Sequence, residues 1–79
     1  ENFINNLGYA FLNTRQLDLA KQFFQLNTLN YPNSSNAFDS LGDFYRSTGK
    51  TEKAIVTYEK AVQLNAHSVA QRKLDTLKR

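Results

Sequence analysis

The chain has 79 residues, a net charge of +3 and no cysteine. This length suits a single domain, and the lack of cysteine excludes disulfide bonds and metal sites built on thiolates. The longest apolar runs cover only a few residues, far short of the ~20 that a membrane-spanning helix needs, so we expect no membrane segment.

The basic excess lies in residues 67–79, because the positive and negative charges balance in both residues 1–34 and residues 35–66. A nucleic-acid-binding protein usually carries a basic stripe over one face. Cations confined to the end of a helix instead complement the helix dipole. We therefore expect no nucleic-acid partner.

The first part of the chain predicts two amphipathic helices. Apolar residues at three-and-four spacing mark the first helix, namely Phe3, Ile4, Leu7, Ala10 and Phe11. The pattern breaks at "NTRQ" and resumes with Leu17, Ala20, Phe23, Phe24 and Asn27. Pro32 in "YPNSSN" cannot continue a helix, so the second helix should end before it.

Two further helices and a shorter last one follow. Ser34 or Ser35 should cap the third helix, which is marked by Phe38, Leu41, Phe44 and Tyr45. The turn "STGK" places Gly49 where a left-handed backbone is favoured. The fourth helix is marked by Ala54, Ile55, Tyr58, Ala61 and Val62. Ser68 should cap the last helix, in which Val69, Leu74 and Leu77 are expected to face inward.

The sequence repeats itself after 34 positions. The matched pairs are Leu7 with Leu41, Gly8 with Gly42, Phe11 with Tyr45, Thr14 with Thr48, Ala20 with Ala54, Phe24 with Tyr58 and Ser34 with Ser68. Such a period indicates stacked supersecondary units. Glycine weakens a helix by roughly 0.5–1 kcal/mol, so its recurrence at one register predicts close packing between helices.

These residues resemble the tetratricopeptide repeat, a 34-residue helix-turn-helix unit. The matches are Leu7, Gly8, Ala20, Phe24 and Pro32, then Leu41, Gly42, Tyr45, Ala54 and Ala61. The resemblance implies an all-α superhelix over residues 1–79, with repeats at 1–34 and 35–68 and a capping helix at 69–79. Asn27 and Ala66 depart from the family pattern, which has a small residue and a proline there.

The sequence offers no catalytic or metal-binding pattern. His67 is the single histidine and lies in a predicted turn, and no "G-x-S-x-G" motif is present. Asp39 and Asp43 share a helix face, but two carboxylates are too few for a dedicated cation site. We therefore expect no enzyme activity, no cofactor and no metal.

The resemblance instead implies protein–protein interaction through the concave face lined by the first helix of each repeat. The candidate groove residues are Asn2, Asn5, Tyr9, Leu12, Asn36, Asp39, Asp43, Arg46 and Lys73. Asparagine can hydrogen-bond a peptide backbone as donor and acceptor. Asp39 and Asp43 favour a neutral or basic partner over an acidic C-terminal tail. The alternative is that these are merely solvated polar positions.

A second functional alternative starts from the open N-terminal face of the first helix. Phe3, Phe11 or Leu12 should remain partly exposed there and dock a preceding domain or another copy of the chain. The stretch around "YPNS" and "DSLG" resembles repeats found as tails behind bacterial serine-hydrolase domains. This resemblance implies a structural or dimerising tail within a larger protein. The compartment stays open.

Overall fold

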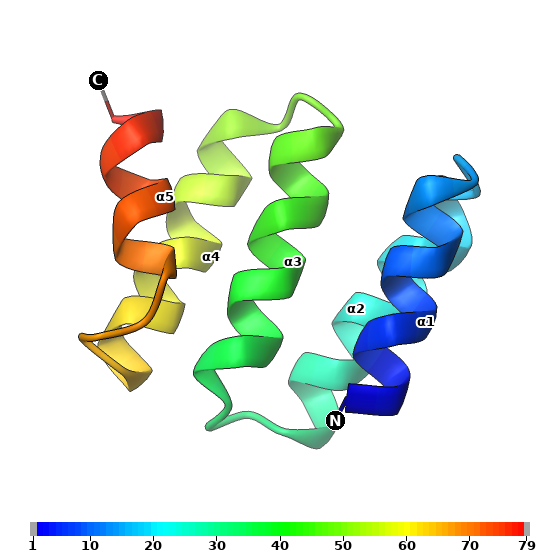
Figure 1. Ribbon diagram of the computed structural model, residues 1–79, viewed down its shortest axis with the longest axis horizontal. Helices are drawn as coiled ribbons and strands as arrows, with labels where there is room; N and C mark the ends of the chain where they lie inside the picture. Colours follow the sequence, from blue (N-terminus) through cyan, green and yellow to red (C-terminus); the bar gives the residue numbers. More distant parts are fainter. Residues whose placement is uncertain (1, 79) are drawn as a thin grey trace.

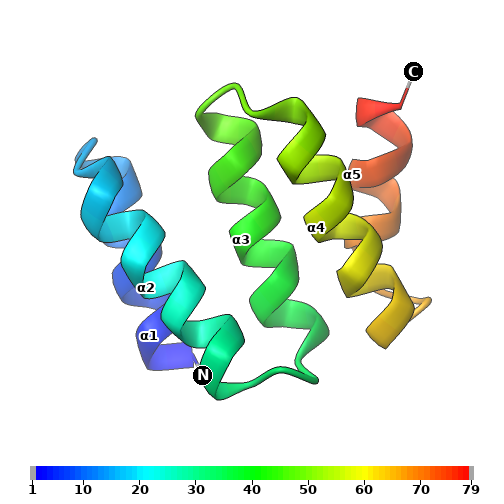
Figure 2. The ribbon, with the colours of Figure 1, turned by 180° about the vertical axis from the view of Figure 1, so that it is seen from behind.

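Five helices stack in two layers in the computed structural model, which describes residues 2–78 (Figure 1). They are α1 (Asn2–Asn13), α2 (Leu17–Asn30), α3 (Ser35–Ser47), α4 (Thr51–Leu64) and α5 (Ala70–Leu77). α1, α3 and α5 form one layer, and α2 and α4 form the other, which lies in front when the molecule is seen from behind (Figure 2). The all-α prediction of two helix pairs and a capping helix is confirmed.

The helix boundaries follow local chemistry at most of the predicted places. α2 ends at Asn30, before Pro32, and the Ser34 hydroxyl accepts a hydrogen bond of 3.1 Å from the amide of Ala37 at the start of α3. Gly49 adopts a φ of 79° between α3 and α4, as its place in the turn predicts. These signals set the two helix-turn-helix units.

The start of α5 differs from the prediction. Ser68 does not cap the helix: its hydroxyl is buried and has no hydrogen-bond partner among the described residues, and the N-cap is Val69, whose backbone is itself helical. Val69 is 59% exposed, so the expectation that it faces inward is wrong. Ala70, Leu74 and Leu77 form the inward stripe because their spacing of four and three keeps them on one helix face.

Both repeated glycines mark a close approach between the layers. A Cβ atom on Gly8 would lie 2.7 Å from the Phe24 ring, and one on Gly42 would lie 2.5 Å from the Tyr58 ring. Phe24 and Tyr58 are fully buried and lie one 34-residue repeat apart. The packing role predicted for the glycines is therefore confirmed.

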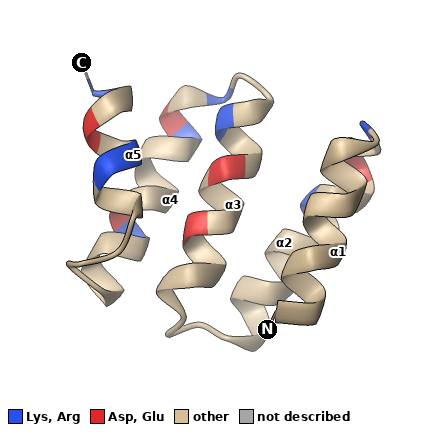
Figure 3. Cartoon of the chain, viewed as in Figure 1, with Lys and Arg blue, Asp and Glu red and all other residues tan. Residues whose placement is uncertain are grey.

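Charge is distributed unevenly over the helices. α1 carries no acidic or basic residue, whereas α3 and α5 both carry charged side chains (Figure 3). Within residues 2–78, no helix combines the length and apolarity that crossing a membrane requires.

Candidate binding surface

The layer of α1, α3 and α5 joins polar side chains that lie far apart in the sequence. Tyr9 lies on α1, Asp39 and Asp43 on α3, and Lys73 on α5. Their spacing follows the repeat, since Tyr9 and Asp43 are 34 residues apart, as are Asp39 and Lys73. Equivalent positions of successive repeats are thus brought side by side.

Asp43 is the centre of this arrangement. The Tyr9 hydroxyl donates a hydrogen bond of 2.6 Å to its Oδ2, and the Tyr58 hydroxyl donates to its Oδ1. The Lys73 ammonium lies 3.1 Å from the same carboxylate. Arg46, one turn along α3, places Nη2 at 3.4 Å from Oδ1. A carboxylate that is almost fully buried thereby accepts hydrogen bonds from three other helices and forms an ion pair with Arg46 of its own helix.

Asp39 has Lys73 as its partner. The Lys73 ammonium donates to both carboxylate oxygens at 3.1 Å, and Asp39 is only 6% exposed. Burial raises the pKa of Asp39 above its usual value, and the hydrogen bonds and charge of Lys73 oppose that rise. Lys73 also lies over the Tyr58 ring, with Nζ 5.9 Å from the ring centroid.

The two tyrosine hydroxyls act as donors in this network. Burial raises the pKa of Tyr9 and of Tyr58 well above the usual tyrosine value, and the hydrogen bond that each donates to Asp43 raises it further. Both phenols therefore stay protonated at neutral pH and keep donating to the carboxylate. We call Tyr9, Asp39, Asp43, Tyr58 and Lys73 the polar network.

The other candidate residues lie at different depths. Asn2, Asn36 and Arg46 are exposed along α1 and α3. Leu12 belongs to the hydrophobic core, and Asn5 is buried, with no hydrogen-bond partner for its Oδ1 in the part of the chain that the structure describes. Some of the predicted groove residues thus meet in the polar network, whereas two others, Asn5 and Leu12, are buried in the interior of the protein.

Tyr58 is a network residue that the sequence reasoning missed. Its ring occupies the core between α3 and α4. Because Tyr58 belongs to the apolar stripe of the fourth helix, the sequence pattern indicated only a packing role for it. Its counterpart one repeat earlier is Phe24, which has no hydroxyl. That difference between matched aromatic positions was the available signal.

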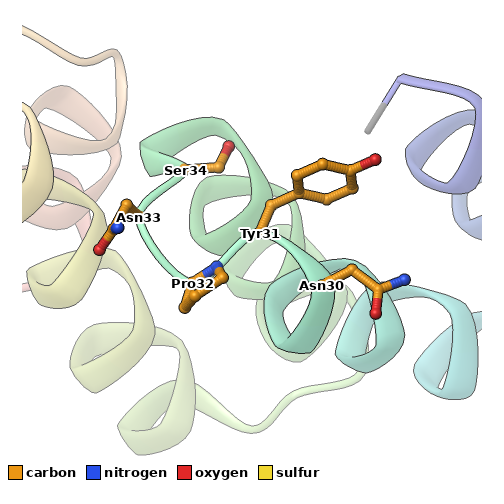
Figure 4. Close-up of a pocket in the computed structure, with 5 residues that line it drawn as sticks. All are labelled: Asn30, Tyr31, Pro32, Asn33 and Ser34. Carbon is orange, nitrogen blue, oxygen red and sulfur yellow. The ribbon is translucent and has the colours of Figure 1, made fainter.

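A shallow hollow also occurs at the connection between α2 and α3. It is lined by the consecutive residues Asn30, Tyr31, Pro32, Asn33 and Ser34 (Figure 4). The lining comes from one continuous segment and contains no charged side chain. The hollow therefore does not bring functional groups of different helices together. The polar network is therefore the better candidate for function.

Comparison with known proteins identifies the repeated unit. A family model described as tetratricopeptide repeat matches residues 2–26 and 35–68, which together make up most of the chain. No curated protein matches the chain.

Proposed function

Because the chain belongs to the tetratricopeptide repeat family, whose repeats are generally protein–protein interaction modules, we propose that it binds a peptide or partner segment. The proposed binding surface is the concave face of α1, α3 and α5. Such a module is typically non-catalytic, and no reaction is proposed for it.

The polar network is the observation that carries this proposal. Its hydrogen bonds join α1, α3 and α5, the three helices of this layer, so the exposed residues beside it are held on one connected surface. Asn2, Asn36 and Arg46 are the exposed candidates that could contact a partner directly. Tyr9 is half-buried and adds an amphipathic side chain to this surface.

We infer that the partner segment is neutral or basic. Arg46 and Lys73, two cations of this layer, already lie within 3.4 Å of Asp43. A partner carboxylate would compete with Asp39 and Asp43 for those cations and would meet like charges. A neutral backbone or a basic side chain avoids that competition.

Selection from a random-peptide display library would test the proposal. Arg46→Ala and Asn36→Ala change the concave face, and the matched controls Lys60→Ala and Gln63→Ala change exposed positions of α4 in the other layer. We expect the first pair to weaken the selected peptides about tenfold, or ~1.4 kcal/mol, and the controls to leave affinity unchanged.

Equal affinity for all four variants would contradict binding at the concave face. The net charge of the selected peptides tests the partner chemistry separately. Enrichment of acidic C-terminal sequences would contradict the preference for neutral or basic segments.

A second candidate function is a structural or dimerising tail. Phe3 of α1 favours it, because its side chain is 75% exposed and shares a helix face with Leu7 and Ala10, which are not buried either. Adjoining exposed apolar residues of this kind mark interaction surfaces. Attachment to a bacterial serine hydrolase stays a prediction from the sequence resemblance alone.

A further inference from the structure

The first helix pair presents uncovered apolar side chains on the side away from α3. Phe3, Leu7 and Ala10 lie on one face of α1, and none of the three is buried. α2 adds a stripe at similar spacing, and its Phe23 stacks on Phe11 of α1 with ring centroids 5.4 Å apart. We call this surface the N-terminal face; its residues are Phe3, Leu7, Ala10, Leu19, Phe23 and Leu26.

The second repeat carries charge where the N-terminal face carries leucine. Leu19 and Leu26 correspond, one 34-residue repeat later, to Lys53 and Lys60. The Lys53 ammonium lies 5.7 Å from the ring centroid of Tyr45, and Lys60 lies 5.9 Å from that of Phe38. Cations thus cover the rings of the second repeat.

The first helix pair lacks this charged cover at both positions. Leucines replace the two lysines, and α1 has no charged residue (Figure 3). The cores of protein interfaces are depleted in charged residues in the same way. The N-terminal face therefore has the composition of a surface that another protein buries.

The shape of the N-terminal face argues against a partner helix that packs on α1 in the way that α2 packs on α3. Phe44 of α3 contacts Phe24 of α2, with ring centroids 6.1 Å apart, and Ala37, two turns earlier, is fully buried. The corresponding positions of α1 are Ala10 and Phe3, so the large and small side chains are exchanged. A helix placed as α2 is on α3 would meet a phenylalanine where there is room for an alanine.

The same exchange makes α1 complementary to itself. Phe3 and Ala10 lie two turns apart, ~10 Å along the helix. An antiparallel two-fold pairing of α1 with α1 of a second copy sets each Phe3 over the other copy's Ala10. Asn6 then lies beside the axis, where its amide can donate to and accept from its symmetry mate.

We propose that the chain forms a two-fold dimer by antiparallel packing of α1 on α1, with Phe3 of each copy seated over Ala10 of the other. This inference rests on the second proposed function, and it specifies the partner as a second copy of the chain and the pairing as antiparallel. It leaves the concave face of each copy open to a partner segment.

Single-cysteine crosslinking tests the geometry, because the chain has no native cysteine. Asn6→Cys and Asn13→Cys change exposed asparagines seven residues apart on one face of α1. In the proposed dimer the two thiols introduced by Asn6→Cys face each other, whereas those introduced by Asn13→Cys lie ~20 Å apart. A disulfide needs Cα atoms within ~7 Å, so only Asn6→Cys should give a covalent dimer on mild oxidation.

Sedimentation over a concentration series tests the association itself. We expect the unmodified chain to dimerise, Phe3→Glu to weaken the dimer at least about tenfold, and Val56→Glu, at an exposed site on α4, to leave it intact. Circular dichroism would verify that both variants keep their helices.

The outcomes separate the two levels of the proposal. A wild-type monomer into the high micromolar range would overturn the dimer and the dimerising function together. A dimer in which Asn13→Cys crosslinks as well as Asn6→Cys would overturn the antiparallel pairing and leave dimerisation standing. Neither result would alter peptide binding at the concave face.

Discussion

The ammonium of Lys73 lies 3.1 Å from both carboxylate oxygens of Asp39, a residue one full repeat earlier in the chain. The same cation reaches Asp43, so a single side chain of α5 compensates two buried carboxylates of α3. The capping helix is therefore fixed by charge as well as by the apolar contacts of Ala70 and Leu74.

Lys73→Met should lower the free energy of unfolding by about 1–3 kcal/mol. The substitution leaves Asp39 buried without its cation, and the partial exposure of Lys73 keeps the loss below that of a fully buried pair. Urea denaturation followed by circular dichroism measures the change. Lys78→Met is the control, because its bridge to Glu59 is exposed and should contribute less than about 1 kcal/mol. Equal losses for the two variants would contradict a special role for Lys73.

Gly42→Ala should destabilise the fold by about 1–3 kcal/mol, although alanine favours a helix over glycine. The added methyl group would lie 2.5 Å from the Tyr58 ring, which is fully buried and anchored to Asp43 through its hydroxyl. Thermal and urea unfolding measure the effect, and Gly42→Leu should be worse. A more stable Gly42→Ala variant would show that the ring shifts freely, and would refute the packing argument.

Asn27→Ala should stabilise the chain by about 1 kcal/mol. Among residues 2–78, neither polar atom of the Asn27 amide has a hydrogen-bond partner, although the side chain is fully buried. The equivalent position in the second repeat is Ala61, which is also fully buried. Replacement removes an unsatisfied polar group and improves helix propensity. Asn30→Ala, at an exposed position of the same helix, should change stability by less than about 0.5 kcal/mol. A marked loss of stability in Asn27→Ala would contradict the expectation.

The pH dependence of stability should carry a contribution from Asp39. Its pKa is raised in the folded chain, chiefly by burial, so the folded state holds this proton more tightly than the unfolded state does. The resulting stabilisation is fully present below the unfolded pKa of ~3.9 and is lost as pH rises through the raised folded pKa. The stability of the wild type minus that of Asp39→Asn should therefore fall as pH rises through this window. Urea denaturation at a series of pH values would measure it, and a difference that rises with pH would contradict the sign.

The 34-residue repeat predicted the fold because the residues that recur in it are the ones that pack against each other. Gly8 and Gly42 share a register with each other, and so do Phe24 and Tyr58, and the structure places each glycine against the matching ring. Helix ends were predictable where one side chain decides them, as at Ser34 and Gly49. Ser68 failed as a cap because its hydroxyl makes no hydrogen bond to the first turn of α5, which the residue type alone cannot show.

Only part of the polar network could be predicted from the sequence, and its hydrogen bonds could not. Helix periodicity indicates that Asp39 and Asp43 share a face, but it cannot show which cation an adjacent helix brings to them. From the sequence, Asp39 and Asp43 therefore have no identifiable cationic partner. In the structure, α5 brings Lys73 within 3.1 Å of both carboxylates. The depth of Asn5 and Leu12 likewise depends on the neighbouring helices, which no pattern within α1 reveals.

The donors around Asp43 couple the two ends of the chain. In a helical solenoid each unit normally contacts only its neighbours, so unfolding can start at an end and spread. Here Tyr9 near the beginning and Lys73 near the end meet at one carboxylate in the middle. Fraying of either terminal helix removes a partner from the same buried charge, which penalises partly folded forms and favours all-or-none cooperativity.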